Sequence, residues 1–234
     1  MERNTCSHHY LGFLVLRSQE GKIQLIGRLF FNIEEYYAVM FQKKVGIITF
    51  DNAEVLDVMG PLEVFSVAGR ISEPSKFQVV LVSDSQQKSV TLRHGLRILT
   101  DRNIFEEGEF DLIIVSGGIT TNAEQNKNLL EFLVKSKTRG TLIASICTGA
   151  FILAEAGLLG GNNVTTHWED QKELQDRFPE LNVIPDQRWV ESEGIYTSGG
   201  ISAGIDLSLH LVQVLSDQEL ALRTAKQMEY KWNQ

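Results

Sequence analysis

A cysteine lies where an apolar run of the sequence ends and an apolar helical pattern begins. Cys147 follows the run 140–146 and is itself followed by Thr148 and Gly149. A thiol at such a tight strand-to-helix turn points into a cleft, and the positive end of the following helix is expected to lower its pKa. The pattern small-x-Cys-x-Gly is the thiol counterpart of the serine elbow of hydrolases. The sequence therefore predicts a reactive thiolate at Cys147, in preference to a cysteine that only fills space in the core.

Two glycine pairs are candidates to complete a pocket around this thiol. Gly117 and Gly118 end an apolar run, and amides at such a turn can stabilise the charge that develops when a thiolate attacks carbon. We expect the amides of Gly118 and Thr148 to converge on one substrate atom, because ligands of open α/β sheets collect beyond the carboxyl ends of the strands. Gly199 and Gly200 join a short strand to a helix, where they either present amides to the same cleft or serve packing.

Two titratable side chains are candidates for proton transfer. Asp57 follows the first strong strand pattern and has apolar neighbours in the sequence. Partial burial among them would raise its pKa and let it give a proton to a substrate atom, but capping of the next helix is an equal alternative. His167 ends another strand pattern. It either orients or deprotonates Cys147, or it is a structural histidine.

The composition of the chain limits the classes of partner. The 234 residues are 43% hydrophobic and 22% charged, which is typical of a globular protein with one sizeable core. The formal net charge is -8 and no long cluster of Lys and Arg occurs, so neither nucleic acid nor an anionic membrane is an expected partner. Cys6 and Cys147 are too few for a disulfide framework, and no signal peptide or membrane span is recognisable. We therefore predict a cytoplasmic protein that acts on a small molecule.

Residues 1–42 differ from the rest of the chain. They mix polar and aromatic residues without clear periodicity, and Met40 directly precedes the first strong strand pattern. We expect Met40 to be the natural start and residues 1–42 to be an extension outside the fold. The alternative is an ordered arm in which 14–16 and 23–26 form a hairpin. Residues 43–234 are expected to form a single domain, in which no dinucleotide fingerprint, phosphate loop or complete metal-ligand set predicts a cofactor or a metal.

The pattern of elements after Met40 predicts the class of fold. Short β-rich runs alternate with helical patterns, which is typical of a mainly parallel sheet with helices on both faces. We expect strands over 45–50, 77–82, 96–99, 112–115, 141–146, 164–166, 183–184, 189–191 and 195–197. Helices are expected over 61–69, 126–137, 149–159, 203–215 and 217–231. The first of these helices should open at Pro61, because proline is tolerated in a first turn, and 193–194 should form a hairpin turn.

Taken together, these motifs resemble those of the ThiJ/PfpI superfamily of class I glutamine-amidotransferase-like proteins. The matching segments, in the family's order, are Leu56-Asp57-x-x-Gly60-Pro61, Gly117-Gly118, Ile146-Cys147-Thr148-Gly149, Thr165-Thr166-His167-Trp168 and Gly199-Gly200-Ile201-x-Ala203-Gly204-Ile205-Asp206. Ser116 departs from the pattern, because relatives commonly have proline before the first glycine pair. The chain is most similar to the isonitrile hydratase branch and to the ligand-sensing domains of AraC-type regulators.

This resemblance implies a flavodoxin-like α/β sandwich and a homodimer. It implies that Cys147 is the nucleophile, that Asp57 is its acid/base partner, that Thr148 assists, and that His167 lies in the pocket. Thr148 replaces the histidine of the protease-like branch, so peptidase activity is disfavoured. The implied reaction is hydration of an isonitrile to an N-substituted formamide through a Cys-bound thioimidate.

Two other functions are compatible with the same resemblance. One is a non-catalytic sensor of a ligand or of oxidants, and the other is glyoxalase- or deglycase-like chemistry on a carbonyl carbon. AraC-type relatives continue into a helix-turn-helix domain, whereas this chain ends near Trp232. A free-standing DNA-binding regulator is therefore not expected.

Overall fold

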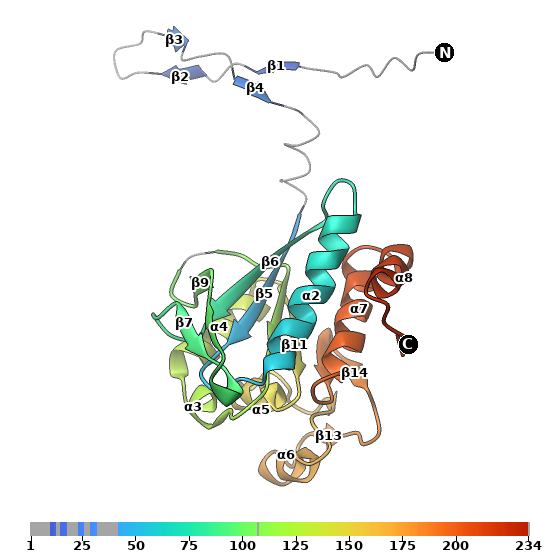
Figure 1. Cartoon of the computed structure of the whole chain (residues 1–234). Coiled ribbons are helices and arrows are strands. Elements are labelled where there is room, and N and C mark those ends of the chain that lie inside the picture. Colours follow the sequence, from blue (N-terminus) through green and yellow to red (C-terminus); the bar gives the residue numbers. More distant parts are fainter. Residues whose placement is uncertain are drawn as a thin grey trace.

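The computed structural model describes residues 42–106 and 108–233, together with four short strands nearer the N-terminus (Figure 1). Of these strands, β1 (Tyr10–Gly12) pairs antiparallel with β4 (Leu29–Phe31), and β2 (Val15–Arg17) pairs antiparallel with β3 (Ile23–Leu25). The second pair falls on the two segments that the ordered-arm alternative assigns to a hairpin. Met40 lies outside the described residues, and its role as the natural start stays a prediction.

A seven-stranded sheet forms the centre of the fold, in the order β14-β15-β11-β10-β5-β6-β9. Every neighbouring pair is parallel except β14 and β15, which are antiparallel and form one edge. The turn between these two strands has positive φ at Glu193 and Gly194, as a tight hairpin requires. The strands are β5 (Lys43–Thr49), β6 (Phe77–Ser83), β9 (Arg102–Asn103), β10 (Leu112–Val115), β11 (Leu142–Ile146), β14 (Trp189–Ser192) and β15 (Ile195–Ser198).

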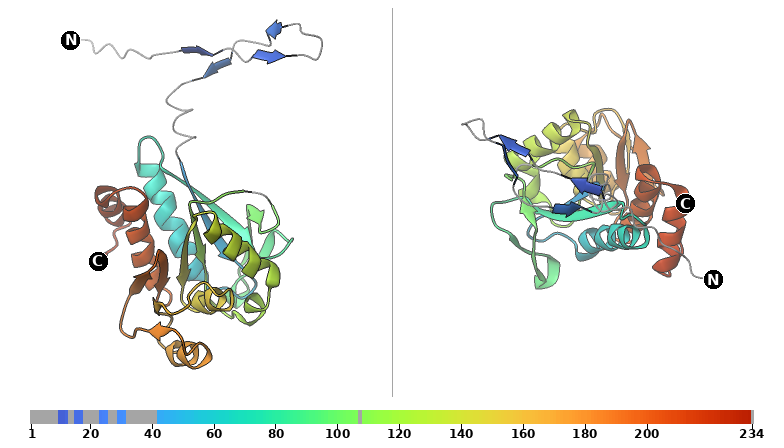
Figure 2. Two further views of the ribbon diagram at one scale, coloured as in Figure 1. Left: turned by 180° about the vertical axis from the view of Figure 1, so that it is seen from behind. Right: turned by 90° about the horizontal axis from the view of Figure 1, so that it is seen from above.

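Helices cover both faces of this sheet (Figure 2). One layer holds α2 (Val55–Ile71), α7 (Ala203–Leu215) and α8 (Gln218–Gln227), and the other holds α3 (Thr121–Glu124), α4 (Lys127–Thr138) and α5 (Gly149–Glu155). The central strand β10 shows why helices pack on both faces of the sheet. Leu112 and Ile114 pack into the core under the first layer, whereas Ile113 and Val115 pack into the core under the second. A run that is buried on both faces is what an interior parallel strand requires, so the predicted α/β sandwich is confirmed.

The smaller elements lie beside this sandwich. The strands β7 (Ser89–Thr91) and β8 (Arg97–Leu99) form an antiparallel pair around a 3-10 turn at Arg93–Gly95. The strands β12 (Asn163–Val164) and β13 (Asn182–Val183) are parallel and flank α6 (Gln171–Arg177), which the sequence analysis did not predict. Only Leu174 of α6 is buried, so this helix leaves almost no periodic apolar signal. Within the described residues, no helix combines the length and the apolar character needed to cross a membrane.

The start of α2 corrects the sequence analysis. The helix begins at Val55, and Pro61 lies inside it rather than at its first turn. A residue outside the helix fixes where it begins, because the N–H of Glu54 donates to the carbonyl of Gly117 in the loop after β10. Glu54 occupies the capping position, so the alternative in which Asp57 caps the helix is wrong. Asp57 lies in the first turn and is fully buried.

Candidate active site

Four loops meet beyond the carboxyl ends of adjacent parallel strands. The strands β15, β11, β10 and β5 are neighbours in the sheet and run in one direction. The segments that follow them carry Ile201, Cys147, Gly117 and Asp57, respectively. In an open parallel sheet this edge is where ligands bind, because the helix and loop ends leave a crevice there. The arrangement brings together four of the five motifs from which the sequence analysis built its site, and the fifth contains His167.

Cys147 occupies the sharp turn between β11 and α5. Its φ is 56°, in the left-handed region that costs an L-residue about 1 kcal/mol or more. Three contacts hold the turn: the Cys147 N–H lies 3.2 Å from the carbonyl oxygen of Ser198 and 3.3 Å from that of Gly199, and the hydroxyl of Thr166 donates to the Cys147 carbonyl at 2.8 Å. The expected elbow geometry is confirmed. The role of Thr166 in it was not foreseen, because a hydroxyl in a strand pattern gives no distinctive signal.

The carboxyl group of Asp57 lies between two backbone turns and the thiol. Oδ2 accepts the N–H of Gly117 at 3.2 Å, Oδ1 accepts the N–H of Ile201 at 3.1 Å, and the carboxyl group is hydrogen-bonded to Cys147. Burial raises the pKa of Asp57 to about 7, with the charge of Glu54 adding to the increase and the three hydrogen bonds opposing it. The predicted direction of this pKa shift is confirmed.

The pKa of Cys147 differs from the expectation. Its pKa is raised to about 12, mainly by burial and to a smaller extent by the negative charge of Asp57. The N–H of Thr148 lowers it by hydrogen bonding, but this effect is outweighed. The thiol is only 7% exposed, so the loss of solvation exceeds the benefit of the helix N-terminus. The prediction of a lowered pKa is therefore wrong: the group at rest is a thiol beside a carboxyl group.

The turn at Gly117 and Gly118 is closely fitted to the elbow. A Cβ atom at Gly117 would lie 2.7 Å from Cys147 Cβ and 2.8 Å from Asp57 Oδ2, so only glycine fits there. Gly118 has a φ of 135° and exchanges two hydrogen bonds with the Thr148 hydroxyl, donating its N–H at 2.8 Å and accepting at its carbonyl at 2.9 Å. The Gly118 amide is thus occupied by protein, whereas the sequence analysis expected it to face substrate. The tight fit explains the need for glycine better than an anion site does.

The second glycine pair borders the thiol on its other side. A Cβ atom at Gly200 would collide with the imidazole of His167 and lie 3.3 Å from Cys147 Sγ, so the two side chains face each other across this glycine. His167 Nδ1 is 3.4 Å from Asp170 Oδ2, which orients the ring. Gly199 meets only ordinary contacts at its Cβ position. His167, Gly199 and Gly200 all line the cavity on this side, and of the two glycines only Gly200 is restricted to glycine by its neighbours.

Two cavities lie near Cys147: one is lined by Gly200, which borders the thiol, and the other by Thr148, the next residue of the chain. The first has a volume of about 600 Å³, and its wall includes His167, Trp168, Arg188, Gly200 and Ile201. The side chain of Trp168 is 73% exposed at this site, and Ile201 is also exposed. The wall of this cavity therefore combines glycine and exposed apolar side chains with polar ones such as Gln171, Asp186 and Ser202.

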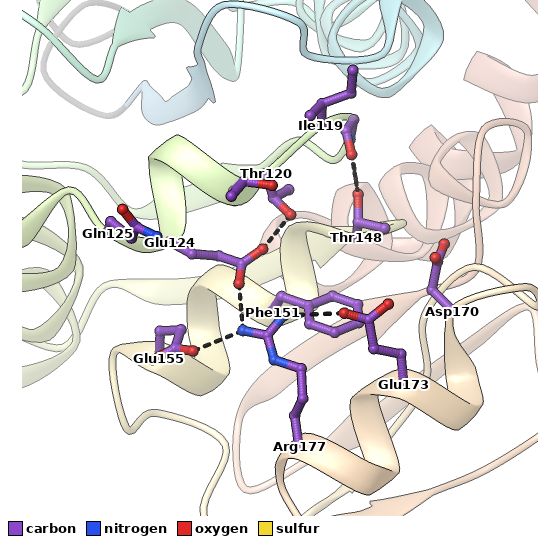
Figure 3. Close-up of a pocket in the computed structure, with 12 residues that line it drawn as sticks. Ile119, Thr120, Glu124, Gln125, Thr148, Phe151, Glu155, Asp170, Glu173 and Arg177 are labelled. Atoms are coloured by element: carbon purple, nitrogen blue, oxygen red, sulfur yellow. Dashed lines mark hydrogen bonds and ion pairs between the residues drawn. The ribbon is translucent and has the colours of Figure 1, made fainter.

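The second cavity, of about 450 Å³, is strongly acidic (Figure 3). Thr148 lies at one side, and the guanidinium of Arg177 lies opposite, bound by Glu124, Glu155 and Glu173. These residues come from α3, α5 and α6, and nothing in their spacing along the chain could have shown that they meet. Among the described residues, no cluster of His, Cys, Asp or Glu side chains is arranged to hold a metal ion.

Comparisons with known proteins agree with this geometry. Residues 43–214 match the model of the DJ-1/PfpI family. An isonitrile hydratase from Pseudomonas putida is 31% identical over 189 residues, which are 80% of this chain and 78% of the hydratase. The HTH-type transcriptional regulator GbdR of Pseudomonas aeruginosa is 26% identical over 81% of this chain, and the match spans only about half of the regulator, 51%. The crystal structure of DJ-1beta from Drosophila melanogaster matches 82% of this chain and 100% of its own with a TM-score of 0.73 at 21% identity.

Proposed function

The chain belongs to the DJ-1/PfpI family, and from this premise we propose that it is a cysteine-dependent enzyme that hydrates a small isonitrile to an N-substituted formamide. The observation that carries the proposal is the pairing of the Cys147 thiol with the fully buried carboxyl group of Asp57. A thiol of high pKa attacks carbon efficiently only when a neighbouring base accepts its proton as the bond forms. Asp57 is in place to be that base.

The first step uses both groups. As Cys147 Sγ attacks the terminal carbon of the isonitrile, the thiol proton passes to the Asp57 carboxylate and from there to the same carbon. The product is a thioimidate, R–N=CH–S–Cys147, with one new C–S bond and one new C–H bond. With its pKa near 7, Asp57 is suited both to accept and to return a proton at neutral pH.

The second step releases the product. Water adds to the thioimidate carbon, the C–S bond breaks, and the sulfur leaves as a thiol after it regains a proton. The resulting N-substituted formamide, R–NH–CHO, differs from the isonitrile by one water molecule, so the balance needs no oxidant or reductant. The Thr148 N–H, which is hydrogen-bonded to the Cys147 sulfur, stabilises the departing sulfur.

We assign the substrate to the cavity beside Gly200. An isonitrile carries no net charge, and this cavity is lined by Gly200, which lies against Cys147 Sγ, and by the exposed apolar side chains of Ile201 and Trp168. The cavity beside Thr148 is less suitable, because its carboxylates outnumber its single guanidinium, Arg177. A small alkyl or aryl group on the isonitrile nitrogen would pack on the apolar side chains and leave the terminal carbon at the sulfur.

The test is steady-state formation of the formamide from a simple alkyl isonitrile. We expect turnover by the wild-type protein and loss of turnover in Cys147→Ala and in Asp57→Asn. Asp111→Asn is a matched control, because Asp111 bonds Lys43 and the Lys44 amide near the opposite ends of the same strands. Absence of formamide with folded wild-type protein, or full activity of Asp57→Asn, would disprove the proposal. Sedimentation equilibrium on the same samples tests the proposed homodimer.

A ligand-sensing role is the second candidate, supported by the similarity to HTH-type regulators. A sensor would bind an isonitrile or another ligand stoichiometrically without converting it, so the number of turnovers separates the two functions. Redox sensing fits less well, because the thiolate is the species that is oxidised and burial holds the pKa of Cys147 high. Consumption of methylglyoxal in place of isonitrile would indicate the carbonyl-directed alternative.

A further inference from the structure

The turn from Gly199 to Ser202 performs two tasks at the site while its backbone is strained. The N–H of Ile201 donates to Asp57 Oδ1, and Gly200 lies against Cys147 Sγ. Ile201 has a φ of 55°, a conformation that β-branched residues rarely adopt. Such a conformation persists only where the surroundings hold it in place.

Arg188 holds this turn at both ends. Its carbonyl accepts the N–H of Gly199 at 3.0 Å. Its guanidinium lies 3.3 Å from the hydroxyl of Ser202 through both Nη atoms, and Nε donates to Asp206 Oδ2 at 2.6 Å. The contacts therefore lie before and after the strained residue Ile201. The sequence analysis named Asp206 only as part of the family's last motif, and it did not consider Arg188.

Asp206 gives Arg188 a fixed point to bind. Its side chain is fully buried in the first turn of α7. Oδ1 accepts the N–H of Asn233 at 3.1 Å, and the Asp206 carbonyl accepts Nε1–H of Trp232 at 3.2 Å. The carboxylate is thus held by the C-terminal segment as well as by Arg188. The guanidinium binds a group whose position does not depend on the turn.

We propose that Arg188 is a positioning residue of the active site, which holds the turn 199–202 so that the Ile201 N–H stays on Asp57 and Gly200 stays against the Cys147 thiol. The proposal deepens the proposed function and rests on it for the reaction, but the geometry of the thiol and the carboxyl group can be tested without any isonitrile. Arg188 reaches neither reacting atom. It acts through the backbone of Gly200 and Ile201.

Loss of the Arg188 side chain should change how the reactivity of Cys147 depends on pH. The part of the profile that should move is the acid limb, where reactivity rises with pH. The groups that face the carboxyl group of Asp57 are Glu54, the Cys147 thiol and the N–H groups of Gly117 and Ile201. Of these, the Ile201 N–H is the one that Arg188 controls. Its loss would remove a hydrogen bond that favours the carboxylate, so Asp57 would accept the thiol proton only at higher pH.

The experiment measures the rate of alkylation of Cys147 by iodoacetamide against pH, followed on the Cys147 peptide by mass spectrometry. Arg188→Met should move the acid limb upward by about one pH unit, which for a group with a pKa of about 7 slows alkylation at pH 7 by about fivefold. Arg188→Lys, which keeps the charge, should give a smaller shift. An acid limb unchanged in folded Arg188→Met would overturn the proposal.

Ser202→Ala is a second variant that tests the proposal if Arg188→Met fails to fold. It removes one contact of the turn and leaves the Arg188–Asp206 ion pair intact, so the protein should fold. We expect the acid limb to move in the same direction by a smaller amount. A limb identical to that of the wild type in both Ser202→Ala and Arg188→Lys would also overturn the proposal.

An Ile201→Gly background separates positioning from charge. Glycine adopts a positive φ without cost, so the turn no longer needs to be held. The shift caused by Arg188→Met should fall to less than about one third in this background. A shift of undiminished size would mean that Arg188 acts through its charge, and the proposal would be wrong. Failure of isonitrile turnover together with the expected alkylation shifts would disprove only the proposed function.

Discussion

The two turns that border Cys147 are built in different ways. At Gly117 and Gly118 the space is closed by backbone and by the elbow itself, and both amides are bonded, to Asp57 and to Thr148. At Gly200 the neighbouring group is a side chain, the imidazole of His167. The first turn cannot adapt without moving Cys147, whereas the second can adapt by moving the ring of His167.

This difference assigns separate tasks to the two sides of the site. Asp57 bonds to both turns, with Oδ2 on Gly117 and Oδ1 on Ile201. The rigid side therefore fixes the thiol and the carboxyl group relative to each other. The turn at Gly200 borders the larger cavity, to which we assign the substrate. A change of residue there is expected to alter the choice of substrate without altering the chemistry.

Gly117→Ala should break the rigid side and have the largest effect. A methyl group there would lie 2.7 Å from both Cys147 Cβ and Thr148 N, and neither atom can move without the elbow. We expect turnover to fall by about 1000-fold and the free energy of unfolding to fall by about 3 kcal/mol. Steady-state kinetics and urea unfolding measure the two effects. A loss of less than about tenfold would mean that the turn is not rigid.

Lowering the pH tests the group that joins the two turns. Asp57 must be ionised to accept the thiol proton, and its pKa of about 7 lies far above the usual value of 3.8. We therefore expect kcat/KM to rise with pH up to about 7, and to be about 100-fold lower at pH 5 than on the plateau. The profile is measured with the alkyl isonitrile in buffers of constant ionic strength. A profile that falls as pH rises through 7 would assign Asp57 the role of an acid that starts protonated.

Gly200→Ala should have a smaller effect, because the adaptable side can respond. The new methyl group would meet the His167 ring, whose side chain is 19% exposed, so the ring would have to turn toward solvent and away from Asp170. We expect about a tenfold loss of kcat/KM with little change in stability. The double variant Gly200→Ala/His167→Ala should recover part of the loss. A double variant worse than the product of the two single effects would contradict this account.

Thr148→Val should have the smallest effect. It removes both hydrogen bonds with Gly118 while the shape of the side chain is kept. We expect a loss of stability of about 1 kcal/mol and a severalfold loss of activity, with Thr148→Ser close to the wild type. Thermal unfolding and steady-state kinetics are the measurements. An increase in activity would show that the freed Gly118 amide serves the substrate, as the sequence analysis expected.

The sequence was sufficient to predict the α/β sandwich and six of the seven strands of its sheet, but not the two-residue edge strand β9. Buried strands such as β10 carry a continuous apolar signal, and the motifs at their carboxyl ends converge because neighbouring parallel strands end at one edge. Local signals were less reliable at Pro61, where the contact between Glu54 and Gly117 starts the helix earlier than proline alone indicates.

The electrostatics of the site could not be read from the sequence. The helix N-terminus after Cys147 is a local feature, whereas the burial and the Asp57 charge that raise the thiol pKa depend on residues ninety positions apart and on the packing around them. The Arg188–Asp206 ion pair and the acidic cavity around Arg177 likewise arise from long-range contacts. Such contacts leave no periodic pattern along the chain.

The convergence of four strand ends has a consequence for the order of events in folding. Asp57, Gly117, Cys147 and Ile201 are far apart in the chain, and only parallel pairing, which requires closure of long loops, brings them together. The pocket therefore forms among the last parts of the molecule during refolding. Until then the thiol is exposed and titrates like a free cysteine. Pulses of alkylating reagent during refolding should thus modify Cys147 rapidly at first. Modification should stop only when the β11–β15 pairing is complete, so the alkylation rate of Cys147 reports the final stage of folding.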